Sequence, residues 1–198
     1  MNADAKKHTA AFGWFGIFAV AVFACIWLAC TVMDTSWVWG TSTISDFGIS
    51  KTDAASYFKY GCVLTGALLA VFGVGEACNK SKFGFVLAGV MFVLAGICLA
   101  LLGVFTLDHG NGNVHHAFAY LFMIFMLAAI IAASANYWYD GHEIIGGISI
   151  ALFCVAAAAA FAYPFAHFEV IAAVIGLTWT TMHSALTVAS GIKGKDFQ

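Results

Sequence analysis

The chain has 198 residues, of which 63% are hydrophobic and only 9% are charged, whereas soluble domains are about 45–50% apolar and about 25% charged. A water-soluble fold cannot bury that much apolar surface, so the composition excludes a soluble domain and predicts an integral membrane protein. The formal net charge is −2 and all eight basic residues are lysines. Nucleic-acid binding is excluded, because the chain has no arginine for bidentate phosphate contacts.

Six apolar segments are long enough to span a bilayer, which requires roughly 20 residues per helix. They cover residues 11–33, 55–78, 83–107, 114–135, 144–166 and 168–190. The sequence therefore predicts an all-α fold, a polytopic membrane bundle of about six transmembrane helices in a single transmembrane domain over residues 1–198. Lys59 and Glu76 interrupt the second segment, and we expect both charges to reach the membrane interface from near the helix ends.

The distribution of lysine predicts how the bundle is oriented. Two lysines, Lys51 and Lys59, fall on one side of the predicted topology, and the other side holds Lys6, Lys7, Lys80, Lys82, Lys193 and Lys195. Because lysine is enriched in cytoplasmic loops, we expect the N- and C-termini to be cytoplasmic and the chain to lie in the cell membrane. Trp138 and its neighbours Tyr137 and Tyr139 are expected in an aromatic belt at the inner interface.

Glycine spacing predicts which helices pack most closely. Glycine recurs every seven residues in the second and third segments, at Gly66 and Gly73 and at Gly89, Gly96 and Gly103. This spacing places small residues on one helix face, where they let two backbones approach. We therefore predict a close antiparallel pair of the second and third helices, joined by a turn at Asn79–Ser81.

Polar residues from three loops gather on the predicted outer face. The candidates for ligand binding are Ser45, Asp46, Asp108, His115, His116 and Glu169. Imidazole and carboxylate groups are zinc ligands, which makes His115, His116 and Asp108 candidate metal ligands. Adjacent histidines diverge by about 100° on a helix, however, so only one of the pair can face a given pocket. The simpler interpretation is that these polar side chains cap helices and solvate loops.

The sixth segment carries a polar stripe inside its apolar sequence. The stripe consists of Thr180, His183, Ser184 and Thr187, which follow the i, i+3, i+4, i+7 spacing of one helix face. His183 lies about 21 Å along a helix from Glu169, too deep to join the outer histidines. Polar side chains in a span normally face the bundle. The stripe is therefore either a proton relay or polar ligand pocket, or a hydrogen-bonded contact between helices.

Two stretches of the chain resemble motifs of a membrane-protein family. Ser45-Asp46-Phe47-Gly48 is similar to a Ser-x-Leu-Gly type motif. Gly103-Val104-Phe105-Thr106, with Asp108 and then His115 or His116 after it, is similar to a Gly-x-Phe-Pro stretch followed by an acidic residue and a histidine. Together they resemble DUF998, a family of uncharacterised prokaryotic multi-pass membrane proteins.

The resemblance extends over most of the chain and has two departures. Glu169 and Trp179 stand where that family often has a glutamate and a tryptophan. Thr106 replaces the expected proline, and Val170 replaces the basic residue that often follows the glutamate. The resemblance implies a helical membrane bundle in which the outer Asp, His and Glu act together, and it implies no particular reaction.

Three functions are compatible with these patterns. We expect an outward-facing polar cavity that binds a lipid headgroup or a small ligand, with membrane lipids as partners. An alternative is a metal-dependent hydrolase, with zinc as its cofactor, that acts on a lipid or amide at the outer leaflet. The third is a proton-coupled transporter built around His183. Whether the chain is an enzyme and whether it forms a homo-oligomer both stay open.

Overall fold

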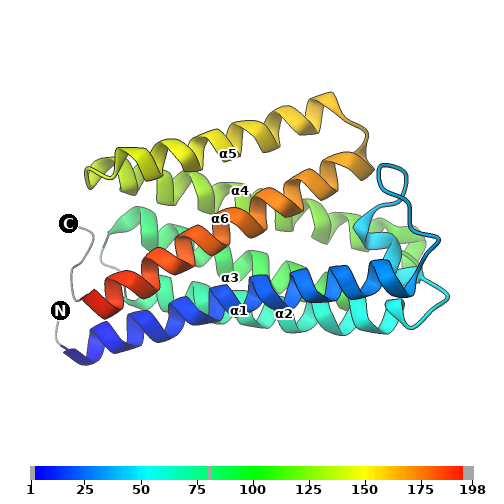
Figure 1. The fold of residues 1–198 in the computed structure, drawn as a ribbon, viewed down its shortest axis with the longest axis horizontal. Helices are drawn as coiled ribbons and strands as arrows, with labels where there is room; N and C mark the ends of the chain where they lie inside the picture. The colour runs from blue at the N-terminus through cyan, green and yellow to red at the C-terminus, as the bar shows by residue number, and fades with distance from the viewer. Residues whose placement is uncertain (1–2, 80–81, 194–198) are drawn as a thin grey trace.

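A computed structural model describes residues 3–79 and 82–193 and shows six long helices joined by short connections (Figure 1). The helices are α1 (Ala3–Met33), α2 (Ala54–Asn79), α3 (Phe83–Val104), α4 (Asn113–Tyr139), α5 (Glu143–Ala162) and α6 (Phe165–Lys193). Two short 3₁₀ helices, η1 (Ile44–Ile49) and η2 (Gly110–Gly112), lie in the connections after α1 and α3. The described residues contain no strand, so the predicted all-α fold is confirmed.

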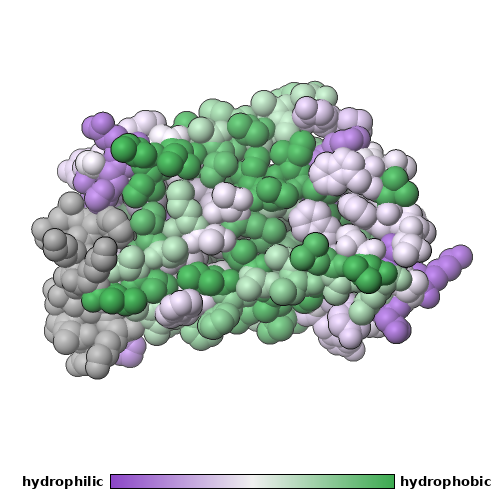
Figure 2. Space-filling model, viewed as in Figure 1, coloured by the Kyte–Doolittle hydropathy of each residue, from purple (hydrophilic) through white to green (hydrophobic). Residues whose placement is uncertain are grey.

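All six helices are long and apolar enough to cross a membrane, as the sequence predicted. Figure 2 shows apolar residues over the middle of one face of the bundle and hydrophilic residues gathered toward its two ends. This distribution matches a bilayer, whose apolar core lies between two polar interfaces. The chain is therefore a multi-pass membrane protein with a helical-bundle fold.

The six helices pack as a closed ring. Each helix packs against the next in chain order, and α6 completes the ring by packing against α1. With an even number of antiparallel spans, α1 begins and α6 ends at the same end of the bundle (Figure 1). We call this the inner end, and we call the other end, where η1 and η2 lie, the outer end.

The closest helix pair is the one that glycine spacing predicts. A Cβ atom added to Gly73 of α2 would lie 2.6 Å from the carbonyl oxygen of Gly89 in α3. One added to Gly96 would lie 2.5 Å from the carbonyl oxygen of Gly66. The two backbones are therefore in direct contact, which the absence of side chains allows. Residues 80–81 of the predicted turn lie outside the described residues.

Several helix ends differ from the predicted ones: α1 begins at Ala3 instead of residue 11, and α4 ends at Tyr139 instead of residue 135. Helix α3 ends at Val104 instead of residue 107, and α5 ends at Ala162 instead of residue 166. Tyr163 is extended (φ −124°, ψ 152°), because a residue that precedes proline is disfavoured in the helical region. Helix α6 begins directly after Pro164. Glu169 therefore belongs to α6 and not to a turn.

Two side chains expected at the membrane interface are buried inside the bundle. Only 1% of Glu76 and 2% of Tyr137 is exposed, whereas Trp138 and Tyr139 are exposed as expected. Helix α4 continues to Tyr139, and the turn of about 100° per residue points Tyr137 inward. Both expectations for Glu76 and Tyr137 were wrong, because each residue meets a polar partner inside the bundle.

Candidate functional site

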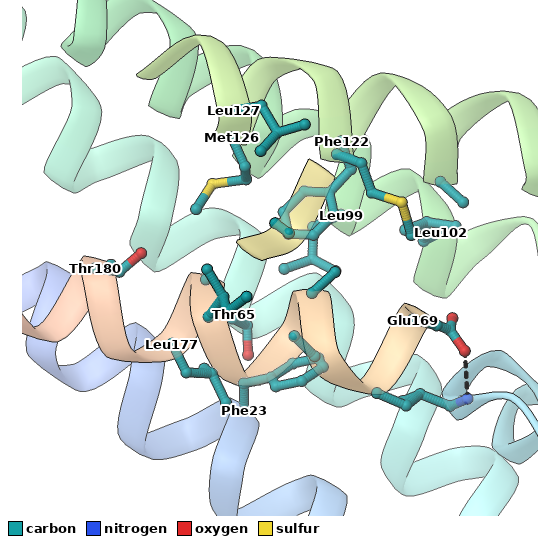
Figure 3. Close-up of a pocket in the computed structure, with 18 of the residues that line it drawn as sticks. Phe23, Thr65, Leu99, Leu102, Phe122, Met126, Leu127, Glu169, Leu177 and Thr180 are labelled. Carbon is teal, nitrogen blue, oxygen red and sulfur yellow. Dashed lines mark hydrogen bonds between the residues drawn. The ribbon is translucent and has the colours of Figure 1, made fainter. Parts of the chain in front are cut away.

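Small residues on two facing helices create a cavity inside the ring. Its lining includes three alanines of α5, which are Ala156, Ala157 and Ala160, and three small residues of α6, which are Ala172, Ala173 and Gly176. Because their side chains end at Cβ or are absent, they leave a cavity of about 170 Å³ that residues from all six helices line (Figure 3). This cavity was not predicted from the sequence, although the alanine run at positions 156–160 was a signal for it.

The lining of the cavity is almost entirely apolar. Figure 3 shows side chains of α1, α3, α4 and α6 that project into it, including Phe23, Leu99, Phe122, Met126 and Leu177. The polar lining residues are Ser45, Thr65, Glu169 and Thr180. This cavity is apolar with few polar groups, so it is not the outward-facing polar cavity expected from the sequence, which stays a prediction.

Glu169 lies at one end of this cavity and Thr180 toward the other (Figure 3). Eleven residues separate them on α6, which corresponds to about 16 Å along the helix axis. Glu169 is 8% exposed. A buried carboxylate at the end of a long apolar cavity is the arrangement that most distinguishes this site from ordinary helix packing.

Glu169 connects α6 to η1 through two hydrogen bonds. Its Oε2 accepts a hydrogen bond of 2.6 Å from the backbone amide of Ile44, and its Oε1 accepts one of 2.9 Å from the hydroxyl of Ser45. The first backbone amides of a helix have no partner within the helix, so this carboxylate supplies an acceptor that η1 needs. The structure thus brings together two of the six predicted ligand-binding residues, Ser45 and Glu169.

Asp46 has a different role at the same 3₁₀ helix. Its Oδ2 accepts from the backbone amide of Thr43 at 2.7 Å, and the Thr43 hydroxyl accepts from the backbone amide of Asp46 at 3.1 Å. This reciprocal pair is a capping box, which fixes the start of η1. Asp46 does not line the cavity, so it acts here as a cap.

The remaining predicted site residues lie apart from the cavity. Asp108 accepts a hydrogen bond from the Thr106 hydroxyl, which holds the pKa of its carboxyl below the ordinary value. His115 is buried, with its Nδ1 2.8 Å from the carbonyl oxygen of Phe105, whereas His116 is exposed. Within the part of the chain that the structure describes, no three His, Cys, Asp or Glu side chains could together hold a metal ion. The structure therefore does not bring Asp108, His115 and His116 together as a group of three metal ligands.

A second polar cluster lies toward the inner end of α6. All four stripe residues, Thr180, His183, Ser184 and Thr187, are buried. The Nδ1 of His183 is 2.7 Å from the hydroxyl of Tyr137, and its Nε2 is 3.5 Å from Oε2 of Glu76. The Thr187 hydroxyl donates a hydrogen bond of 2.7 Å to Oε1 of Glu76.

Two members of this inner cluster were not foreseen as partners of His183. Glu76 carried a signal, since an acidic residue within a span is by default a functional candidate that needs a partner. Tyr137 carried none, because it is adjacent to two aromatic residues that do lie at the surface. The inner cluster thus joins α2, α4 and α6.

Comparisons with known proteins place this chain in a family. The model of the family described as protein of unknown function (DUF998) matches residues 17–186, a range that includes every residue lining the cavity. The comparison with curated proteins and the comparison with solved structures each found no match. The family match agrees with the motifs around Ser45, Asp108 and Glu169 and with the six-helix fold. The chain belongs to DUF998, a family of proteins of unknown function.

Proposed function

We propose that this protein binds an amphipathic, lipid-like molecule within the membrane. The apolar chain of the ligand occupies the cavity, and its polar end lies beside Glu169. The observation that carries this proposal is a cavity of about 170 Å³ whose lining is apolar except for a few polar groups, of which one is a buried carboxylate. Ligand sites are typically mostly apolar pockets with a few polar groups that orient the ligand.

The size and apolar lining of the cavity fit a hydrocarbon segment. An apolar cavity of roughly 150 Å³ stays free of water and accepts a molecule the size of benzene. The cavity of about 170 Å³ here is slightly larger, so it accommodates part of an alkyl or isoprenoid chain. This changes the function expected from sequence: the ligand is held by its chain, and the headgroup contributes one polar contact.

The chemistry of Glu169 restricts the polar end of the ligand. Each of its oxygens already accepts one hydrogen bond from η1, and a carboxylate has about four acceptor sites. The remaining acceptor sites of the Glu169 carboxylate can accept a hydrogen bond from a hydroxyl, an amide N–H or an ammonium group of the ligand. A phosphate or a second carboxylate would be repelled at short range. The proposed ligand is therefore a single-chain alcohol, amide or amine.

A photoreactive long-chain alcohol with a diazirine on its chain tests this proposal. With the protein in phosphatidylcholine nanodiscs, the label should attach to residues of α4 and α6 that line the cavity, such as Met126 and Gly176. Gly176→Leu should abolish most of this labelling, because the nearest atom to an added Cβ there is 4.0 Å away and the new side chain would fill the cavity.

Gly147→Leu is the matched control for this experiment. Gly147 is on α5, outside the cavity lining, and an added Cβ there meets nothing within 4 Å. Labelling in this variant should equal that of the wild type. Equal labelling of the two leucine variants would refute the cavity as the binding site. A phosphatidic acid carrying the same diazirine should label the cavity less than the alcohol does.

We also propose that the inner end faces the cytoplasm. The proposal rests on the distribution of lysine. Lys82, one of the lysines predicted to be cytoplasmic, lies at the start of α3 and forms an ion pair with Asp140. A C-terminal fusion to a fluorescent protein that matures only in the cytoplasm should be fluorescent. A dark fusion in correctly inserted protein would reverse the orientation.

A further inference from the structure

The face of α6 that lines the cavity continues directly into the inner cluster. Several residues of α6 that line the cavity follow one another at intervals of one, three or four positions, as expected for one helix face: Glu169, Ala172, Ala173, Gly176 and Thr180. The same face then presents His183, Ser184 and Thr187, which are all buried. One helix face therefore begins at a carboxylate at the outer end and ends at an imidazole that faces a second carboxylate.

His183 lies in a cage of aromatic rings. The Trp179 ring is stacked on the imidazole, with centroids 5.0 Å apart and an interplanar angle of 7°. The rings of Phe72, Phe85, Phe92 and Tyr137 have their centroids 5.8–6.0 Å from that of His183. Aromatic faces within about 6 Å attract a cation. The stacked rings of Trp179 and Phe92 present their faces to the imidazole, which is an arrangement complementary to a positive charge.

The groups around His183 are also arranged for a positive charge. On α2, both oxygens of Glu76 face donors, since Oε1 accepts from Thr187 and Oε2 lies 3.5 Å from Nε2 of His183. On α4, the phenol oxygen of Tyr137 can accept a hydrogen bond from Nδ1 at 2.7 Å. Helix α3 contributes the phenylalanine rings, and α1 approaches this part of α6 at Gly16, which contacts Ser184. The titratable groups that face His183 in the described structure are therefore Glu76 and Tyr137.

We propose that His183 binds a proton inside the membrane span, as an imidazolium with Glu76 as its counter-ion. A buried carboxylate without a compensating charge is strongly unfavourable, and so is a lone buried imidazolium. One proton makes the pair neutral overall. We place it on His183 because both Glu76 oxygens face donors and the Trp179 ring is stacked on the imidazole, which Tyr137 holds in position. This site binds its proton whether or not the cavity holds an amphipathic ligand, so it goes beyond the proposed function.

Nitrogen NMR of the whole protein, labelled with ¹⁵N-histidine and placed in nanodiscs, tests the proposal directly. The His183 resonances are those lost in His183→Gln, and Trp179→Phe identifies them independently by removing the stacked ring. At pH 7 both ring nitrogens should show the imidazolium pattern. A neutral tautomer pattern in the wild-type protein would overturn the proposal.

Glu76→Gln tests the role of the counter-ion in the same experiment. Glutamine keeps the size of the side chain and an acceptor for the Thr187 hydroxyl, but it removes the negative charge. The His183 resonances should change to the neutral pattern. Persistence of the imidazolium in this variant would remove Glu76 from the site.

The pH dependence of thermal unfolding gives a second, independent test. In His183→Gln the Glu76 carboxylate loses the imidazolium, so Tm should fall as pH rises above about 4, where the unfolded chain ionises. In Glu76→Gln the imidazolium loses its counter-ion, so Tm should fall as pH drops below about 6.5. Each slope should be about 3–5 °C per pH unit.

The double variant Glu76→Gln/His183→Gln is the matched control, because it removes both titrating groups and leaves the other ionisable groups in place. Measured relative to it, the two single variants should have slopes of opposite sign. Slopes of the same sign, or profiles that coincide with that of the double variant, would contradict a shared proton at this site.

Discussion

The carboxylate of Glu169 accepts a hydrogen bond of 2.6 Å from the backbone amide of Ile44, a residue 125 positions earlier in the chain. Together with the hydrogen bond from the Ser45 hydroxyl, this contact joins the start of η1 to α6 at the end of the apolar cavity (Figure 3). Because Ile44 and Ser45 also line the cavity, the same interaction both closes the fold at its outer end and shapes the candidate site. Changes at Glu169 should therefore affect stability as well as ligand binding.

Glu169→Ala should destabilise the bundle more than Ser45→Ala. Alanine at position 169 leaves both the Ile44 amide and the Ser45 hydroxyl without their acceptor, whereas Ser45→Ala removes one donor and keeps the contact with Ile44. A buried polar group left without its partner costs about 1–3 kcal/mol, so the variant that disrupts two contacts should lose more. Thermal unfolding in detergent micelles measures the difference, and equal losses in the two variants would argue against a shared acceptor.

Gly176→Ala and Gly73→Ala should have opposite effects on stability. At Gly176 the nearest atom to an added Cβ is 4.0 Å away, so alanine should stabilise the helix by about 0.5–1 kcal/mol. At Gly73 the added Cβ would lie 2.6 Å from the carbonyl oxygen of Gly89, so α2 and α3 must separate, at a cost of about 1–3 kcal/mol. Unfolding in a graded detergent series provides the comparison. A stabilising Gly73→Ala would mean that the two helices are not in backbone contact.

Asp34 lies in the connection between α1 and η1, and it should make the stability of the folded protein sensitive to acid. Hydrogen bonds from Ser36 and then from Ser50 lower the pKa of its carboxyl. A lowered pKa stabilises the folded state above the ordinary value of about 3.9, and this stabilisation is lost as pH falls through the lowered pKa. The difference in Tm between the wild type and Asp34→Asn should therefore be present at pH 7 and shrink below about pH 4.

Ser50→Ala provides the graded control for that titration. It removes one donor to Asp34, the hydroxyl that approaches Oδ2, and leaves the Ser36 contacts in place. Its effect on Tm at pH 7 should have the same sign as that of Asp34→Asn and should be smaller. A difference that persists unchanged at pH 3 would show that Asp34 contributes through packing alone.

Local sequence properties predicted much of the fold. Hydropathy identified all six spans, since burial in a bilayer depends on the apolar character of each segment by itself. The seven-residue glycine spacing predicted the contact of Gly73 with Gly89, because a small-residue face is a property of one helix. Helix ends were less predictable where a connection, such as that around Pro164, decided them.

The sequence by itself thus determined the class of protein, its six spans, its closest helix pair and its resemblance to DUF998, which the family match confirms. Only the tertiary structure decided that Glu169 meets Ile44, that His183 meets Glu76 and Tyr137, and that alanines leave an apolar cavity. Those contacts depend on how each helix is rotated about its own axis within a closed ring. That rotation is set by the packing of all six helices together, and no single segment encodes it.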